Sequence, residues 1–89
     1  MKVGAIAYQN VADSIKLCFV SSRRHRNTLT LPKGIVKFNE KLTKAATREL
    51  FEEAGVSGKV KRKAYPLLFV SKKPEIDDVL YFFDLLLMV

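Results

Sequence analysis

The sequence predicts an α+β fold in which one helix packs against a mixed or antiparallel β-sheet. Apolar, β-branched runs occur near both ends of the chain, VGAIAY (3–8) at the start and VLYFFDLLLMV (79–89) at the end. Between them, residues 41–54 carry one convincing helical pattern, and a glycine follows. Strands, helix and strands in this order are typical of an α+β domain. The 89 residues, 48% of them hydrophobic, suffice for a single domain (1–89) with one modest core.

Short strands and loops are predicted for the first half of the chain. Residues 3–8 and 15–20 (IKLCFV) are separated by turn-forming residues, which predicts a hairpin. The segments that follow are a polar loop, a short strand and a second loop, at 21–27 (SSRRHRN), 28–32 (TLTLP) and 33–40 (KGIVKFNE). Cys18 is interpreted as a small core residue, because a single cysteine cannot form an intramolecular disulfide. This cysteine usage fits a reducing, cytoplasmic setting.

The second half begins with the helix over 41–54, which ends because Gly55 suits a left-handed C-terminal cap. Residues 58–71 (GKVKRKAYPLLFVS) are predicted to form a strand that Pro66 interrupts or places at a sheet edge. A loop, 72–78 (KKPEIDD), leads to the final strand, 79–89. That apolar run is too short for a membrane helix, which needs about 20 residues.

Three glutamates, Glu49, Glu52 and Glu53, share one face of the predicted helix near its C-terminal end. Like charges at this spacing repel by about 0.2–0.5 kcal/mol per pair, and carboxylates also oppose the negative end of the helix dipole. The core-facing side is predicted to consist of Ala46, Leu50, Phe51 and Ala54. A solvated acidic face is the simplest interpretation, and a bound cation is the alternative that offsets both penalties.

The net charge of +7, from 16 basic and 9 acidic residues, predicts an anionic partner. Basic residues gather at 21–27, 58–63 and 71–74, whereas acidic residues gather around the helix. A metal ion that bridges the carboxylates to a polyanion would explain both groups. Nucleic-acid binding through charge alone is a weaker hypothesis, because the sequence has no aromatic–basic RNA-binding motif and no helix–turn–helix.

Residues 34–56, GIVKFNEKLTKAATRELFEEAGV, resemble the Nudix box. The pattern is Gly, five residues, Glu, seven residues, Arg-Glu, an aliphatic residue, any residue, Glu-Glu, any residue, Gly and an aliphatic residue. Its specified positions are Gly34, Glu40, Arg48, Glu49, Leu50, Glu52, Glu53, Gly55 and Val56. The resemblance implies a Nudix-type mixed β-sheet with a catalytic loop–helix–loop that binds divalent metal.

The resemblance also assigns roles within the box. It implies that the metal ligands are Glu49, Glu52 and Glu53, together with the backbone carbonyl of Gly34. Hard oxygen ligands without His or Cys suit Mg²⁺ or Mn²⁺. Arg48 and Glu40 are expected, by the same analogy, to form an ion pair that orients the catalytic helix.

The implied activity is metal-dependent hydrolysis of a diphosphate linkage, in which a glutamate takes a proton from water. Glu52 is the candidate base inside the box. In relatives the base sometimes lies on a later loop, so Glu75, Asp77 and Asp78 stay open as alternatives, with ordinary loop chemistry as the simpler interpretation of those three residues.

Two segments outside the box bear on the substrate. FVSSRRHRN (19–27) resembles a phosphate-binding stretch of the diphosphoinositol polyphosphate phosphohydrolases; the phosphate contacts that it implies are Ser22, Arg24, Arg23 and His25. TLPKG (30–34) resembles diadenosine polyphosphate hydrolases and implies that Lys33 faces the phosphate chain. A solubilising basic loop is the simpler alternative. The lysine favours a nucleoside or dinucleoside polyphosphate over a diphosphoinositol polyphosphate, and RNA 5′-pyrophosphate hydrolysis is a further alternative.

The resemblance also leads to an expectation about the end of the chain. Complete members of the family continue into another strand and a helix, so the chain is expected to lack them and to expose an apolar edge at DLLLMV (84–89). A homodimer or higher oligomer would cover that edge. The alternative to an active enzyme is a catalytically weak or inactive truncated module that binds polyphosphate.

Overall fold

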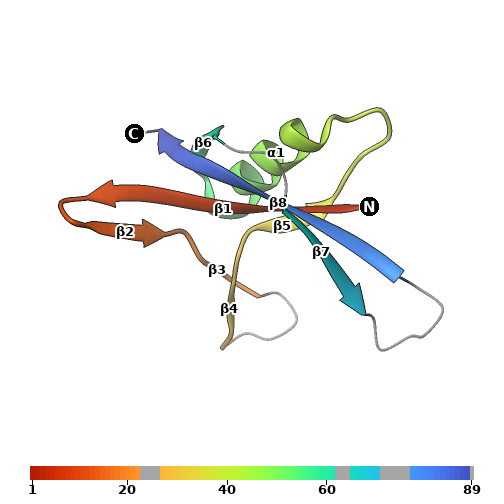
Figure 1. Cartoon of the computed structure of the whole chain (residues 1–89), viewed down its shortest axis with the longest axis horizontal. Helices are drawn as coiled ribbons and strands as arrows, with labels where there is room; N and C mark the ends of the chain where they lie inside the picture. Colours follow the sequence, from red (N-terminus) through yellow and green to blue (C-terminus); the bar gives the residue numbers. More distant parts are fainter. Residues whose placement is uncertain (23–26, 62–64, 71–76, 89) are drawn as a thin grey trace.

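The structure, a computed structural model, describes residues 1–22, 27–61, 65–70 and 77–88 (Figure 1). Its main sheet has six strands: β1 (Lys2–Val11), β2 (Ser14–Leu17), β5 (Lys33–Ile35), β6 (Ser57–Val60), β7 (Tyr65–Val70) and β8 (Asp77–Met88). A second, two-stranded sheet pairs β3 (Val20–Ser21) with β4 (Leu29–Thr30). The helix in the described residues is α1 (Leu42–Ala54). The predicted α+β fold is confirmed.

Strands β1 and β8 form the centre of the main sheet and run parallel to each other. Strands β2 and β5 both pair antiparallel with β1, one with each half of it. On the other side, β6 and β7 pair antiparallel with the two halves of β8. Parallel strands need a long crossover, and α1 lies in the segment that connects β1 to β8 (Figure 1). The sheet is therefore mixed, as predicted.

Several predicted boundaries are corrected by the sheet. The predicted strand 15–20 divides into β2 and β3, and the predicted strand 58–71 divides into β6 and β7. Residues 33–35, predicted as loop, form β5, since their backbone pairs with the first residues of β1. The last strand starts at Asp77, two residues earlier than expected.

The apolar run at the end of the chain is not a sheet edge. Strand β8 has hydrogen-bonded neighbours on both sides, β1 on one and β6 and β7 on the other. The expectation that DLLLMV exposes an unpaired edge is therefore wrong for residues 84–86, whereas Leu87 and Met88 pair with β6 alone. The homodimer inferred from that edge is not tested by a single chain and stays a prediction.

Helix α1 packs on one face of the sheet and closes the core. The buried residues come from β1, α1 and β8: Val3, Ala5, Ala7, Ala45, Ala46, Leu50, Phe83 and Leu85. Small alanines on both elements let the helix lie close to β1. Cys18 is half-buried and packs against this cluster, in agreement with its interpretation as a core residue.

The helix ends as predicted but is rotated relative to the expected orientation. Gly55 adopts a left-handed conformation (φ 71°), and its N–H donates to the Phe51 carbonyl at 2.9 Å. Phe51, which the sequence placed on the core side, is 60% exposed, whereas Glu49 is buried. Ala45 and Glu49 thus point towards the sheet, and this rotation brings the acidic residues next to β5.

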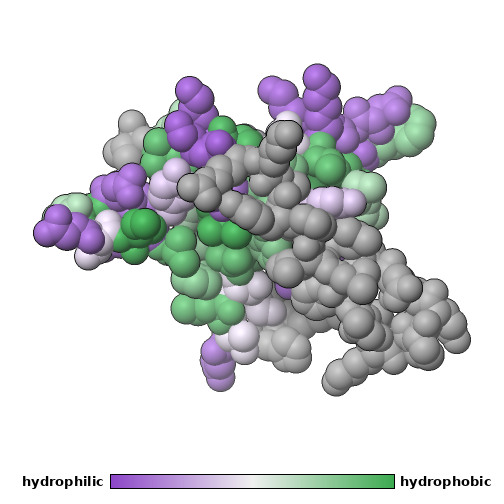
Figure 2. Space-filling view, viewed as in Figure 1, coloured by the Kyte–Doolittle hydropathy of each residue, from purple (hydrophilic) through white to green (hydrophobic). Residues whose placement is uncertain are grey.

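The other face of the sheet is partly apolar. Ile15 and Leu17 of β2 are exposed, and with Ile6 and Tyr8 of β1 they line a shallow depression beside Asp84. In Figure 2, apolar residues gather over β1 and β2, while hydrophilic residues cover the outer side of α1 and the loop before it. Within the described residues, no helix has the length and apolar character needed to cross a membrane.

Candidate metal and phosphate site

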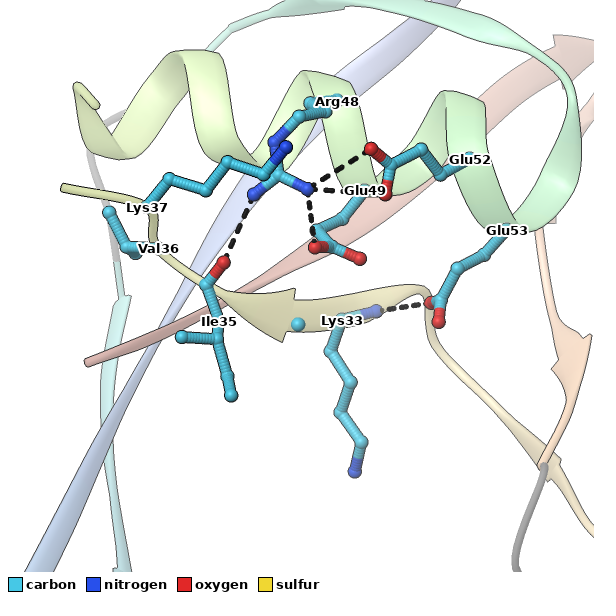
Figure 3. A pocket seen from close by; sticks show the side chains of 9 residues that line it. Lys33, Ile35, Val36, Lys37, Arg48, Glu49, Glu52 and Glu53 are labelled. Atoms are coloured by element: carbon cyan, nitrogen blue, oxygen red, sulfur yellow. Dashed lines mark hydrogen bonds and ion pairs between the residues drawn. The ribbon is translucent and has the colours of Figure 1, made fainter.

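A pocket of about 470 Å³ lies between the last turns of α1 and strand β5 (Figure 3). Its lining residues are Lys33, Gly34, Ile35, Val36, Lys37, Arg48, Glu49, Glu52 and Glu53. The three glutamates reach this pocket from one face of the helix because they are spaced by three and four residues. Glu49, Glu52 and Glu53 therefore form one acidic wall of the pocket, which faces β5.

Arg48 is at the centre of the pocket's hydrogen bonds (Figure 3). Its Nε donates to Glu40 Oε2 at 2.7 Å and its Nη2 donates to Glu40 Oε1 at 2.9 Å, so the predicted ion pair is present and bidentate. Nη2 also donates to the Ile35 carbonyl at 3.0 Å. Nη1 donates to Glu49 Oε1 at 2.7 Å and to Glu52 Oε2 at 3.2 Å. One guanidinium thus links the loop before α1, β5 and two of the three glutamates.

The ion pair changes the protonation equilibria of both partners. Hydrogen bonds from Arg48 and from the Lys37 backbone N–H lower the pKa of Glu40 to about 2. The hydrogen bond to Glu40, followed by those to Glu49 and Glu52, raises the pKa of Arg48 above its ordinary value. Both groups are therefore charged at neutral pH, which maintains the electrostatic attraction between them.

Glu49 is the most enclosed of the three glutamates, with a side chain 12% exposed. Its carboxylate lies directly over Gly34 of β5, where a Cβ atom would overlap all three carboxylate atoms. A side chain at residue 34 would therefore force the Glu49 carboxylate out of its present position. The absent side chain leaves the space that the Glu49 carboxylate occupies.

Glu53 holds the outer edge of β5. Its Oε1 accepts a hydrogen bond from the Lys33 backbone N–H at 2.8 Å, and Arg48 donates to the Ile35 carbonyl on the same edge. In an antiparallel strand, the backbone groups of alternate residues point to opposite sides. Since those of Lys33 and Ile35 point towards α1, those of Gly34 point towards its partner Val3 in β1.

This alternation corrects the expectation that the Gly34 carbonyl is a metal ligand. The Gly34 carbonyl is directed towards β1, away from the glutamates, and the helix-facing backbone groups of β5 belong to Lys33 and Ile35. Sequence reasoning named Lys33 only for its side chain and missed the backbone groups of both residues, because it assigned 33–40 to a loop. Recognition of a strand at 33–35 would have predicted which carbonyls face the helix.

The phosphate contacts predicted outside the box are described only in part. The Ser22 backbone N–H donates to the Thr28 carbonyl, which closes the polar loop. Arg23, Arg24 and His25 lie outside the described residues. Lys33 lines the pocket, but its side chain extends away from the glutamates (Figure 3). The structure therefore does not bring Lys33 Nζ together with the three carboxylates.

The alternative candidates for a catalytic base have different positions. Glu52 is the most open of the pocket glutamates, with its side chain 50% exposed, so water reaches it freely. Glu75 lies outside the described residues. Asp77 and Asp78 belong to β8, where they pair with Val70 and Phe69, so their assignment to a loop is wrong.

The donor chemistry of the pocket fits a hard divalent cation, because three carboxylates line one open space. The present side-chain positions do not form a closed metal site. In the described part of the chain, no three His, Cys, Asp or Glu side chains are grouped so that they could hold a metal ion. Glu49 and Glu52 are turned to Arg48, and Glu53 is turned to Lys33 N–H. Rotation of these side chains would be needed to hold a cation.

Comparisons with known proteins find relatives in sequence and in fold. Two curated Arabidopsis thaliana proteins are similar in sequence to this chain. Nudix hydrolase 18, mitochondrial, is 35% identical to it over 77 residues, and Nudix hydrolase 17, mitochondrial, is 32% identical over 77 residues. These alignments cover 79% of this chain, but only 43% and 42% of the relatives, so the chain spans less than half of their length.

Solved structures show the same fold. A C. elegans Ap4A hydrolase superposes with a TM-score of 0.80 at 22% identity, covering 97% of this chain and 66% of that protein. The E. coli dihydroneopterin triphosphate pyrophosphohydrolase gives a TM-score of 0.62 at 16% identity, covering 94% of this chain and 66% of that one. A family model, the NUDIX domain, matches residues 2–87, which is nearly the whole sequence. The chain therefore belongs to the NUDIX domain family.

Proposed function

We propose that this protein hydrolyses a diphosphate linkage in a nucleoside or dinucleoside polyphosphate with the help of Mg²⁺ or Mn²⁺. The observation that carries the proposal is the acidic wall of Glu49, Glu52 and Glu53 in one pocket beside β5. Family membership supports the reaction class. The structural likeness to a protein described as an Ap4A hydrolase supports a dinucleoside polyphosphate as the first substrate to test.

The three glutamates would hold the cation once their side chains turn towards the pocket centre. When bound, a divalent cation neutralises phosphate oxygens and lowers the pKa of its water ligand. Arg48 and Glu40 fix the helix relative to β5, so the carboxylates stay aligned with the strand. Glu52, the most exposed of the three, is the group that we assign to accept the proton from the attacking water.

The substrate's phosphate chain needs positive partners beyond the cation. Lys33 would contact a phosphate outside the acidic cluster, because its side chain extends away from the glutamates. Ser22, Arg23 and Arg24 are proposed to contact the remaining phosphates. The net charge of +7 favours the approach of such a polyanion.

One observation favours a second candidate function, polyphosphate binding with weak or no turnover. The three glutamates are engaged by Arg48 and by the Lys33 N–H, and they do not converge on one point. If the carboxylates stay in these positions, the pocket would not hold the cation that hydrolysis needs. The basic residues of the chain could still bind the polyphosphate. Turnover, rather than binding, separates the two functions.

The test is product release by the purified chain in the presence of Mg²⁺ or Mn²⁺. The substrates are diadenosine polyphosphates, nucleoside triphosphates, ADP-ribose, diphosphoinositol polyphosphate and 5′-triphosphorylated RNA. Glu53→Gln removes a proposed ligand, while Asp13→Asn, in the exposed β1–β2 turn, is a matched carboxylate-to-amide control. Turnover that is lost in Glu53→Gln and kept in Asp13→Asn supports the enzyme. A folded wild-type chain that binds polyphosphate without turnover supports the second candidate.

A further inference from the structure

The two edges of the Arg48 guanidinium have different partners. Nε and Nη2 donate to both carboxylate oxygens of Glu40, at 2.7 and 2.9 Å, and Nη2 also donates to the Ile35 carbonyl. Nη1 alone donates to Glu49 Oε1 and to Glu52. The first edge therefore anchors the side chain, whereas Nη1 reaches into the acidic wall.

Nη1 lies between two carboxylates that belong to the proposed metal site. It is 2.7 Å from Glu49 Oε1 and 3.2 Å from Glu52 Oε2. Nη1 therefore takes up one oxygen of Glu49 and faces both oxygens of Glu52, in the space where a divalent cation would bridge the two carboxylates. A cation and Nη1 cannot both occupy the space between these oxygens, since both are positive and both require direct contact.

We propose that Arg48 is a built-in counterion that competes with the divalent cation for Glu49 and Glu52, and that Glu40 limits this competition by holding the opposite edge of the guanidinium. The proposal rests on the proposed metal-dependent function. It adds that Arg48 lowers the affinity of the site for the cation, so that a higher cation concentration is needed to occupy the site.

The anchor explains how Arg48 can release the carboxylates without leaving the site. Its bonds to Glu40 and to the Ile35 carbonyl do not involve Glu49 or Glu52, so they persist when Nη1 loses its partners. If Glu40 is removed, only the Ile35 carbonyl still holds Nη2, so the guanidinium can turn further towards the remaining carboxylates. Loss of Arg48 and loss of Glu40 should therefore change cation affinity in opposite directions.

The experiment measures Mn²⁺ binding without substrate, from the decrease of the free Mn²⁺ signal in electron paramagnetic resonance. The variants are Arg48→Gln, Glu40→Gln and Lys44→Gln, the last being an exposed cation one helical turn earlier that controls for the loss of one positive charge. We expect Arg48→Gln to lower the Kd by about 3- to 10-fold and Glu40→Gln to raise it by about threefold. Lys44→Gln should change it by about twofold or less.

Weaker Mn²⁺ binding in Arg48→Gln would overturn the proposal, because Arg48 would then support the ligands rather than compete with the cation. Equal effects of Arg48→Gln and Lys44→Gln would also overturn it, since they would show a general charge effect. Circular dichroism checks the folding of each variant. If Arg48→Gln does not fold, Arg48→Lys replaces it. The Kd of Arg48→Lys for Mn²⁺ should be lower than that of the wild type, because an ammonium group lacks the planar fork of a guanidinium. Absence of Mn²⁺ binding in the folded wild type would instead refute the metal-dependent function itself.

Discussion

Gly34 of β5 and Glu49 of α1 are in direct contact, and the carboxylate of Glu49 occupies the place where a side chain at residue 34 would begin. This contact joins the strand to the helix at the edge of the acidic pocket. It also explains why a charged side chain is buried on the sheet side of α1. The position of the Glu49 carboxylate in the site therefore depends on the absence of a side chain at Gly34.

Gly34→Ala is expected to destabilise the fold by about 1 kcal/mol, because the new methyl group displaces the Glu49 carboxylate from its hydrogen bond with Arg48. It should also weaken Mn²⁺ binding by displacing Glu49 from the pocket. Chemical denaturation and Mn²⁺ titration measure the two effects. Gly55→Ala is the matched control: it is strained by the positive φ, at a cost of about 1–2 kcal/mol, but a methyl group there meets no atom within 4 Å. Equal Mn²⁺ affinity in both variants would contradict the role given to Gly34.

Acid should weaken the fold through Glu40. Its pKa is lowered to about 2 from an ordinary value of 4.5 by Arg48 and by the Lys37 N–H, so the folded state favours the ionised carboxylate. The stabilisation is fully present above pH 4.5 and is lost as the pH falls towards 2. The free energy of unfolding of the wild type and of Glu40→Gln, measured between about pH 6 and about pH 2, should converge at the acid end. A constant difference across this range would be inconsistent with the ion pair.

Leu50→Ala should destabilise the fold by about 2–5 kcal/mol, since the side chain is fully buried between α1 and the sheet. Phe51→Ala, one residue later, should change the stability by about 0.5 kcal/mol or less because Phe51 is 60% exposed. Urea denaturation of both variants provides the comparison. A larger effect at Phe51 than at Leu50 would show that the helix is rotated from the orientation described above.

Mn²⁺ should stabilise the folded chain, because a ligand that binds only the folded state raises the free energy of unfolding. At a concentration about 100 times the Kd, the expected gain is about 2.7 kcal/mol. Thermal denaturation with and without the cation would show it as a rise in Tm. Glu53→Gln should lose most of that rise, whereas Asp13→Asn should keep it. The same rise in Glu53→Gln would mean that the cation binds elsewhere.

Local sequence patterns predicted α1, its end at Gly55 and the set of acidic residues on one helix face. These features depend on residues within a few positions of one another, such as Gly55 after the last turn and glutamates at helical spacing. The ion pair of Arg48 with Glu40 was expected from the family pattern, and the structure contains it. The family itself was also recognisable from residues 34–56, since the whole motif lies in one short segment.

The sequence alone thus determined the presence of one helix, its acidic face and the strand-rich character of both ends. Tertiary structure decided the rest: β5 forms because β1 offers it a partner about thirty residues away, and β8 lies at the centre because strands pair on both of its sides. It also decided that Glu49 is buried while Phe51 is exposed. The physical reason is that the helical period shows which residues share a face, but only packing against β1, β5 and Gly34 decides which face turns inward.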